Sequence, residues 1–444
     1  MMLLIKNGTI VTMNDTREII QGDLLIDGDR ILAVGGTEPI PTHEITVINA
    51  AGKLVIPGLI QTHTHLCQAL FRGLADDLEL LDWLKLRIWP LEGSHDAESI
   101  YYSALLGCAE LLSGGTTSII DMATVHHTDS LLNAVKYAGI RYLGGKCLMD
   151  CGTDAPPTLL ENPTDALQES MDLWEHWNGA ENFRIHYALC PRFAVSCTHG
   201  LLSELAALSR QHAIPIHSHA SENRGEIAMV EKATGHRNIM YLNSLGLLNS
   251  NTVLAHCIHL DQVEMRVLVD TGTNIAHCPG SNLKLGSGIA KIPDLLAMGA
   301  RISLGADGAP CNNNMSMFME MRLAALIQKP LHGPSCMPAR QVFELATRGG
   351  ARAMGMETEI GSLEPGKKAD IALIDLKGWH HQPRDAASVY SHLVYQASAG
   401  DVAATIVDGQ VLWQDGRLTH LDDEDIHTGT ASSVQRLLKR TGLA

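Results

Sequence analysis

The sequence predicts an α/β protein: a (β/α)8 TIM-like barrel with a small composite β-sandwich formed by both termini. Three observations support this prediction. The chain has 444 residues, which suits one large barrel with an accessory domain. A central region of about 300 residues alternates short apolar strands with longer helical segments, as repeated β-α units do around a parallel sheet. Both ends consist instead of short strands separated by tight turns.

Residues 1–56 are expected to form the first part of the sandwich. The segments LLIKNGTIVTM and DLLIDGDRILAV contain Asn7-Gly8 and Asp27-Gly28, dipeptides that favour two-residue hairpin turns. Residues 365–444 repeat this texture with the strand DIALIDL and two further Asp-Gly turns in ATIVDGQVLWQDGRL. The final segment, SSVQRLLKRTGLA, predicts a closing surface helix. The two ends together are therefore expected to complete one sandwich.

Residues 57–364 are expected to form the barrel. Helical patterns lie near residues 128–138 and 199–212, between apolar segments that predict strands: SIIDM, IRYLGGKCL, FRIHYALC, IPIHSHA, TVLAHC, NIAHC and ISLGAD. The active sites of such barrels lie at the carboxyl ends of the strands. Polar residues at these strand ends are therefore the candidates for chemistry.

The composition excludes several classes of protein. An apolar fraction of 45% and a charged fraction of 18% exclude global disorder. The 33 basic against 49 acidic residues give a net charge of −16, which argues against nucleic acid or a membrane surface as partner. The start MMLLIKNGTI has no basic leader and no apolar run spans a membrane, so a cytoplasmic location is expected.

The cysteine content indicates no special role, whereas the histidine content favours a chemical one. The ten cysteines form no C-x-x-C array, and a chain of this length needs no disulfides, so reduced, mostly buried thiols are expected. The 22 histidines are many for this length. Histidine is the commonest metal ligand and titrates near neutral pH, so this content favours a chemical role.

The first candidate cluster is His63-Thr64-His65, which follows the apolar run LVIPGLI. Side chains two residues apart in a strand point to the same face, so the two imidazoles can grip one metal ion. Chance is the alternative explanation, because a chain this rich in histidine is expected to contain one such pair.

The second cluster is IPIHSHASE, in which a strand ends in His217 and His219, followed by Glu222. If His219 holds a metal ion, Glu222 can lie beside the water on that ion and act as a general acid and base. The alternative is a helix start, since Ser221 and Glu222 also suit an N-terminal cap.

Two further strands end in His256 and Asp307. A carboxylate in the segment ISLGADGAP needs a partner if it is buried. His63, His65, His219 and Asp307 would form a nitrogen and oxygen ligand set that suits Zn²⁺, the favoured ion, and also Fe²⁺. One metal ion is favoured over two, because no lysine is well placed at a middle strand end to bridge a second ion, and Lys146 is the only one nearby. His259 and His277 are weaker candidates.

With these residues in place, the chain resembles the metal-dependent amidohydrolases. More narrowly it is similar to the branch holding the 5′-deoxyadenosine, methylthioadenosine/S-adenosylhomocysteine and guanine deaminases and the triazine hydrolases. The resemblance spans nearly the whole chain and rests on KNGTIVTMN, VIPGLIQTHTH, GGTTSIIDM, HASEN, LAHC, HCPGSNLKLGSGIA, LGADGAPCNNN and GSLEPGKKADIALIDL. It implies a barrel with a composite sandwich, a mononuclear site with His63, His65, His219 and Asp307 as ligands, and a homo-oligomer.

The resemblance also implies a substrate pocket. Glu92 in WPLE matches a glutamate that binds ribose hydroxyls in the adenosine-type deaminases, whereas Gln68, Arg192 and Phe193 resemble base-contacting residues of guanine deaminases. A 5′-deoxyadenosine-type substrate is favoured. Each of these residues also has a structural explanation: Arg192 as an ion pair, Phe193 as core, Gln68 as a loop cap. Trp83 and Trp89 are expected to pack, and His126-His127 to lie in a surface loop.

The expected reaction is hydrolytic removal of the exocyclic amine of a purine-type small molecule, with release of ammonia. Asp307 would accept a proton from water, His256 would direct the attacking oxygen and contact the substrate, and Glu222 would protonate the ring nitrogen. Guanine deamination, or hydrolysis of a triazine C–Cl or N-alkyl bond or of a cyclic amide, is the alternative within catalysis. A non-catalytic scaffold of the dihydropyrimidinase-related kind is the alternative outside it.

Overall fold

The computed structural model describes residues 2–36, 45–152 and 154–443. Both ends of the chain meet in one nine-stranded sheet with the order β20-β19-β18-β17-β5-β1-β2-β3, in which β4 also pairs with β1. Its strands are β1 (Met2–Val11), β2 (Ile19–Asp27), β3 (Arg30–Val34), β4 (Ile45–Asn49), β5 (Lys53–Pro57), β17 (Ile371–Asp375), β18 (Val402–Val407), β19 (Gln410–Gln414) and β20 (Arg417–Leu418). The two ends therefore fold together, as predicted. The sandwich stays a prediction, because the strand pairing describes a single sheet.

The middle of the chain contributes two parallel sheets with the orders β10-β8-β7-β6-β16 and β12-β13-β14-β15. Their strands are β6 (Leu59–His65), β7 (Thr116–Met122), β8 (Arg141–Gly145), β10 (Ile185–Tyr187), β16 (Asp307–Gly308), β12 (Ile216–Ala220), β13 (Thr252–His256), β14 (Asn274–His277) and β15 (Arg301–Leu304). A two-stranded pair, β9 (Cys147–Leu148) with β11 (Cys190–Pro191), extends β8. This parallel arrangement confirms the predicted α/β class.

The two parallel sheets approach each other at both edges. Next to β10, Leu189 forms a parallel bridge with Ile216 of β12. At the other edge, β15 continues after two residues into β16, where Asp307 pairs in register with Thr64 of β6. Asp307 is thereby placed beside His63 and His65.

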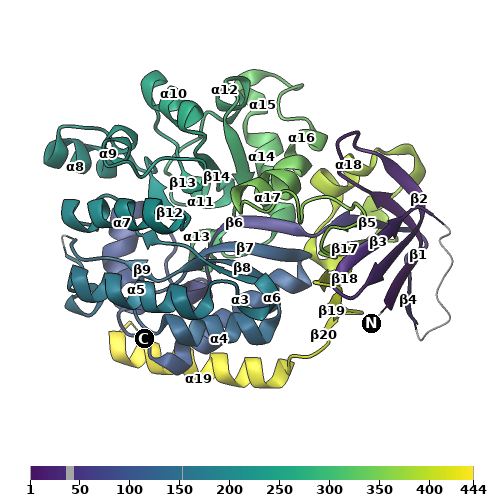
Figure 1. The fold of residues 1–444 in the computed structure, drawn as a ribbon, viewed down its shortest axis with the longest axis horizontal. Helices are drawn as coiled ribbons and strands as arrows, with labels where there is room; N and C mark the ends of the chain where they lie inside the picture. Colours follow the sequence, from purple (N-terminus) through teal and green to yellow (C-terminus); the bar gives the residue numbers. More distant parts are fainter. Residues whose placement is uncertain (1, 37–44, 153, 444) are drawn as a thin grey trace.

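Helices cover the outside of these sheets (Figure 1). The longer ones are α3 (Ala97–Ser113), α4 (Thr128–Ala138), α5 (Pro163–Trp177), α7 (His199–His212), α8 (Arg224–Thr234), α10 (Gln262–Thr271) and α14 (Met317–Ile327). α4 and α7 have the predicted bounds. Many start at a side chain that accepts a backbone N–H, for instance Thr198 at α7 and Asp261 at α10, which satisfies free donors at the helix start.

Shorter helices fill the connections between these elements. They are α1 (Leu80–Trp83), α2 (Trp89–Glu92), α6 (Ala180–Phe183), α9 (Asn238–Ser244), α11 (Pro279–Lys284), α12 (Ile292–Ala297), α13 (Ala309–Asn312), α15 (Lys329–His332), α16 (Ala339–Glu344), α17 (Gly350–Ala353) and α18 (Val389–Ser391). Trp83 and Trp89 are both buried and belong to one apolar cluster with Leu84 and Ile88, so they pack as expected.

The last helix differs from the prediction. α19 spans Asp423–Thr441 and begins nine residues before the predicted start at Ser432. The segment that the prediction missed contains Thr and Gly, which have low helix propensity. Its start is stabilised by Asp422, whose carboxylate accepts the backbone N–H groups of Glu424 and Asp425. The helix lies along the lower edge of the molecule in Figure 1, away from the strands that precede it.

A buried ion pair joins the parallel sheets to the terminal sheet. Arg141 of β8 is fully buried and donates through Nε to Asp370 Oδ2 (2.7 Å) and through Nη2 to Asp370 Oδ1 (3.0 Å). Asp370 directly precedes β17, and Arg141 also contacts Asp408. Removing one partner from such a pair leaves a charge buried without compensation.

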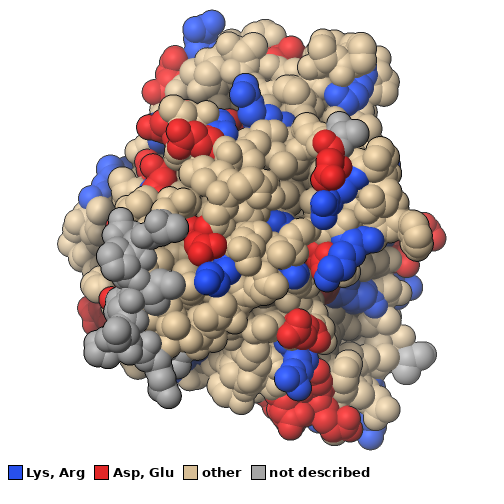
Figure 2. Space-filling view, turned by 90° about the vertical axis from the view of Figure 1, so that its right-hand side faces the viewer, with Lys and Arg blue, Asp and Glu red and all other residues tan. Residues whose placement is uncertain are grey.

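The described surface carries mixed charge. On the face shown in Figure 2, acidic and basic side chains lie next to one another, despite the net charge of −16. None of the helices in the described part of the chain is both long and apolar enough to cross a membrane.

We predict that Asp370→Asn lowers the free energy of unfolding by about 3 kcal/mol, because Arg141 then keeps only Asp408 as a charged partner. Urea unfolding followed by tryptophan fluorescence measures the change. The matched control is Asp415→Asn in an exposed turn, which should change the midpoint little. Equal midpoints for the two variants would show that the ion pair does not stabilise the junction.

Candidate active site

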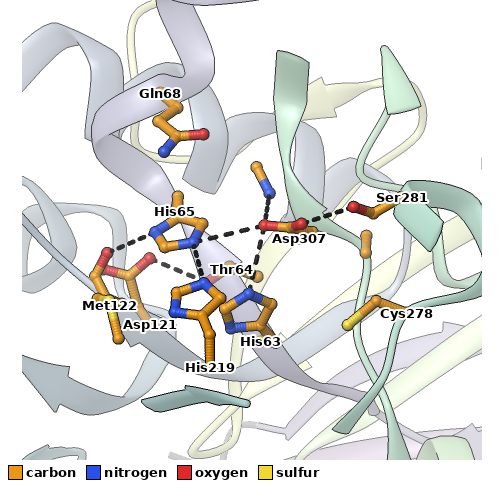
Figure 3. Close-up of polar contacts among 12 residues, drawn as sticks. His63, Thr64, His65, Gln68, Asp121, Met122, His219, Cys278, Ser281 and Asp307 are labelled. Carbon is orange, nitrogen blue, oxygen red and sulfur yellow. Dashed lines mark hydrogen bonds and ion pairs between the residues drawn. The ribbon is translucent and has the colours of Figure 1, made fainter. Parts of the chain in front are cut away.

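Four predicted ligand side chains converge at the carboxyl ends of β6 and β12 and at the first residue of β16 (Figure 3). His63 Nε2 and His65 Nε2 lie 3.3 Å and 3.4 Å from Asp307 Oδ1. His65 Nε2 lies 3.2 Å from His219 Nε2. All four side chains are buried or nearly so. The structure therefore brings together the set that the strand ends predict.

The neighbours of each histidine fix its tautomer. His65 Nδ1 faces the Met122 carbonyl at 3.0 Å, and His219 Nδ1 faces the Arg192 carbonyl at 2.7 Å. A carbonyl only accepts, so each Nδ1 carries the proton and each Nε2 keeps a lone pair. Burial lowers the pKa of His65 to about 4 and that of His219 well below its usual value, which keeps both rings neutral.

His63 reaches the same state through a relay. His217 Nδ1 donates to the Val253 carbonyl (3.2 Å), so its Nε2 accepts the proton of His63 Nδ1 at 2.8 Å. The Nε2 atom of His63 is left buried without a hydrogen-bond partner among the described residues. Three imidazole lone pairs and a carboxylate thus face one point, an arrangement that a cation stabilises and that is unfavourable without one.

Asp307 is held firmly. Its Oδ2 accepts Ser281 Oγ–H (2.7 Å), and its Oδ1 accepts the backbone N–H of Gly308 (2.7 Å). Its φ of 66° lies in the left-handed region, which a residue other than glycine occupies only when its surroundings enforce it. Gly305 is required nearby, because a Cβ there would lie 2.8 Å from the backbone nitrogen of His63.

Glu222 and His256 lie beside this cluster. Glu222 Oε2 is 3.5 Å from His256 Nε2, and Ser287 Oγ donates to Glu222 Oε1 (3.3 Å). Burial raises the pKa of Glu222 to about 7, so its carboxyl group can carry a proton near neutral pH. A proton donor and acceptor is therefore available next to the ligand set.

His256 ends β13 with a left-handed φ of 69°. Its Nδ1 lies 2.9 Å from Asn282 Oδ1, which orients the ring, and its Nε2 points at Glu222 and Asp307. Although burial opposes protonation, these two carboxylates raise the pKa of His256 above its usual value. The ring can therefore donate towards the space between them.

Three predicted substrate residues form a buried chain. Arg192 Nη1 donates to Glu92 Oε2 (2.5 Å), Nη2 donates to Glu92 Oε1 (3.3 Å), and Gln68 Nε2 donates to Glu92 Oε1 (2.8 Å). The structural explanation for Arg192, an ion pair, thus holds in this state. The same contacts hold Gln68 and Arg192 against the cavity.

A cavity opens in front of the cluster, and both apolar and polar side chains line it. Its lining consists of His65, Gln68, Leu80, Trp83, Leu84, Arg192, Phe193, His219, Glu222, His256, Leu285 and Asp307. Apolar side chains combined with fixed polar groups are typical of a small-molecule site. Of the predicted site residues, His63 and Glu92 lie behind this lining.

The remaining candidates lie elsewhere. Lys146 Nζ pairs with Glu161 (2.8 Å) and Glu169 (2.9 Å), so it is not directed at the cluster. His126 bonds the Thr158 carbonyl (2.9 Å) and is absent from the cavity lining, in line with a loop position. His259 Nε2 hydrogen-bonds the Ser287 carbonyl (2.7 Å), and this residue is absent from the cavity lining.

Sequence reasoning assigned no role to several supporting residues. His217 relays the His63 proton, Ser281 holds Asp307, Asn282 orients His256, and Ser287 bonds Glu222. The last three belong to the motif HCPGSNLKLGSGIA, which was noted only as a whole. The role of His217 could have been predicted from its position two residues before His219, because both side chains then lie on the same face of the strand.

The profile of the Amidohydrolase family matches residues 54–412. The chain belongs to the amidohydrolase family. Among curated proteins, this amidohydrolase is 40% identical over 416 residues to 5′-deoxyadenosine deaminase of Methanothermobacter thermautotrophicus, covering 92% of this chain and 93% of the relative. It is 39% identical over 427 residues to 5-methylthioadenosine/S-adenosylhomocysteine deaminase of Nitratidesulfovibrio vulgaris, covering 95% and 94%. These similarities confirm the predicted resemblance.

Solved structures support the same grouping. The amidohydrolase superposes with a TM-score of 0.89 on an adenosine deaminase from Xanthomonas campestris with bound zinc, at 28% identity and with 98% of each chain covered. It superposes with a TM-score of 0.90 on the atrazine chlorohydrolase of Arthrobacter aurescens complexed with zinc, at 25% identity, covering 97% and 100%. E. coli guanine deaminase gives a TM-score of 0.84 at 28% identity, covering 94% and 100%.

We predict that His63→Ala removes one metal ion per chain relative to the unchanged amidohydrolase, because one of the converging lone pairs is lost. Elemental analysis after desalting measures the content, and circular dichroism checks that the fold is retained. His176→Ala, on the exposed face of α5, is the control and should leave the content unchanged. A folded His63→Ala protein with undiminished metal would contradict the ligand assignment.

Proposed function

We propose that this amidohydrolase is a metal-dependent deaminase that hydrolyses the exocyclic amine from a purine-type substrate of the 5′-deoxyadenosine, methylthioadenosine and S-adenosylhomocysteine class. The observation that carries the proposal is the position of Glu222 beside the converging imidazoles and Asp307 in one cavity. The names of the curated relatives support the reaction and the substrate class.

His63, His65, His219 and Asp307 fit a single divalent ion. The His63–Asp307, His65–Asp307 and His65–His219 ligand atoms lie 3.2–3.4 Å apart, and atoms about 2.0–2.1 Å from a tetrahedral centre are separated by about 3.3 Å. Zn²⁺ is favoured by this nitrogen and oxygen set, and Fe²⁺ also fits. When bound, the ion supplies Lewis-acid activation, lowering the pKa of water towards about 7.

Side chains of the protein accept and donate the protons of the reaction. Asp307 accepts a proton from the attacking water, and His256 directs the water oxygen towards the ring carbon that bears the amine. Glu222, which burial keeps partly protonated near pH 7, donates to the adjacent ring nitrogen. After the tetrahedral carbon forms, Glu222 takes up the remaining hydroxyl proton and passes it to the amine, which leaves as ammonia while the C=O bond forms. The proton held by Asp307 then restores Glu222.

The cavity wall suits an aromatic ring with a polar tail. Phe193, Leu80 and Trp83 offer apolar contacts for a heterocycle, and Gln68 and Arg192 offer donors for its ring atoms. Glu92 holds these two donors and accepts three of their hydrogen bonds. Glu92 does not itself line the cavity, so it acts by orienting these two donors, and its contact with a sugar hydroxyl stays a prediction.

Guanine deamination is the second candidate. One observation favours it: the cavity is lined by the three residues that resemble base-contacting residues of guanine deaminases, namely Gln68, Arg192 and Phe193. Chlorine or alkylamine removal from a triazine uses the same ligand set and is a further alternative.

We also propose that the two parallel sheets form one closed (β/α)8 barrel over residues 57–364, and that residues 1–56 and 365–444 form a composite sandwich. The edge contacts Leu189–Ile216 and Asp307–Thr64 support closure. We further propose that the protein is cytoplasmic and forms a homo-oligomer. Size-exclusion chromatography with light scattering tests the oligomeric state.

We predict that Glu222→Gln retains the metal content and lowers turnover by about 10²–10⁴-fold, since the amide cannot carry the transferred proton. Steady-state ammonia release and elemental analysis measure the two quantities. Glu231→Gln, exposed on α8, is the matched control and should keep normal turnover. Turnover within a few fold of normal in Glu222→Gln would remove Glu222 from proton transfer.

We predict that a panel of 5′-deoxyadenosine, methylthioadenosine, S-adenosylhomocysteine, adenosine, guanine and a chlorotriazine yields the highest kcat/KM for a 5′-substituted adenosine. Ultraviolet absorbance and parallel ammonia and chloride assays measure the rates. A preference for guanine over every adenosine compound would replace the first candidate with the second. Chloride or alkylamine release as the fastest reaction would favour the triazine alternative.

A further inference from the structure

A second histidine and aspartate cluster lies in the connection between β17 and β18. His380 and His381 belong to a short 3₁₀ helix, Trp379–His381, and Asp401 ends another, Ala399–Asp401. None of the three lines the cavity of the proposed active site. We propose that these three side chains bind a second divalent transition-metal ion of the Zn²⁺ class, which holds this connection in place.

The spacing of the ligand atoms fits such an ion. His380 Nε2 lies 3.1 Å from Asp401 Oδ1, and His381 Nε2 lies 3.6 Å from the same oxygen. One ligand atom from each of the three residues lies within 4.8 Å of the others. Ligands about 2.0–2.1 Å from a tetrahedral centre are about 3.3 Å apart, so an ion fits between them after small side-chain adjustments.

The contacts behind His381 engage one of its two ring nitrogens. His392 Nε2 lies 3.0 Å from the Arg384 carbonyl, which only accepts, so this nitrogen carries a proton. His381 Nδ1 lies 3.3 Å from His392 Nδ1, so this nitrogen of His381 is turned towards His392. The other ring nitrogen of His381, Nε2, faces Asp401.

This arrangement is unfavourable without a cation. His381 is buried, and its Nε2 has no hydrogen-bond partner in the described part of the chain. It faces the Asp401 carboxylate oxygen across 3.6 Å, which is longer than a hydrogen bond. An unpaired buried polar atom costs about 1–3 kcal/mol, which a shared metal ion would relieve.

Neighbouring groups hydrogen-bond the proposed ligands, as neighbouring groups do for metal ligands in other metalloproteins. Asp401 Oδ2 accepts Ser398 N–H (2.8 Å) and Ser398 Oγ–H (2.9 Å), which orients the carboxylate. Gln396 Oε1 lies 2.6 Å from His392 Nδ1 and holds the ring that lies behind His381. The His380 side chain is 48% exposed, so the site is open to entry of an ion and to a water as fourth ligand.

The test uses the untagged full-length chain with Zn²⁺ as the probe. We expect two Zn²⁺ ions per unchanged chain, one in His63→Ala and none in His63→Ala/His380→Ala. Zn²⁺ should raise the melting temperature of His63→Ala and not that of the double variant. Isothermal titration should show at least about a 100-fold loss of affinity, because losing a ligand costs more than losing an outer-shell partner.

His380→Ala is the main variant because its side chain is half exposed and its removal leaves no cavity in the core. Asp401→Asn is the second variant, since asparagine keeps the Ser398 contacts and removes the charge. Asp401→Asn is likewise combined with His63→Ala. The proposal would be overturned if His63→Ala failed to bind Zn²⁺, or if His63→Ala/His380→Ala and His63→Ala/Asp401→Asn bound it as well as His63→Ala does. These measurements require no turnover, so they are independent of the proposed deaminase activity.

Discussion

Hydrogen bonds from imidazole N–H groups to backbone carbonyls are the constraint on which the proposed active site depends. The carbonyls of Met122 and Arg192 take the protons of His65 and His219 directly, and that of Val253 takes the proton of His217, which in turn accepts from His63. The backbone of the strands therefore sets the direction of the imidazole lone pairs independently of a bound ion. The strand register places the carboxylate, since Asp307 pairs with Thr64 between the two histidines of β6.

Much of this site could be predicted because its signals are local. A histidine pair at a two-residue spacing, a histidine or aspartate at the end of an apolar run, and the helical periodicity of 128–138 and 199–212 all lie within a short window of sequence. In the predicted barrel, all strand ends lie on one rim. The ligand set therefore followed from the strand ends together with the fold class.

The remaining features depend on contacts between distant segments. Arg192 and Glu92 are 100 residues apart, and nothing near either residue indicates that they pair. The early start of α19 depends on a cap at Asp422 and on packing of Gly429 against Tyr102, which outweigh weak local propensity. The cluster around His381 was overlooked for the same reason, because His392 and Asp401 reach it only through the fold.

The shared terminal sheet has a consequence for biosynthesis. β5 is bordered on one side by β17, which leaves the ribosome roughly 310 residues later, or about 15–60 s at ordinary elongation rates. During that interval one edge of β5 lacks its neighbour, and open strand edges invite pairing with other chains. The nascent amino-terminal strands are thus the segment most in need of chaperone protection, and truncation before residue 371 would make that exposure permanent.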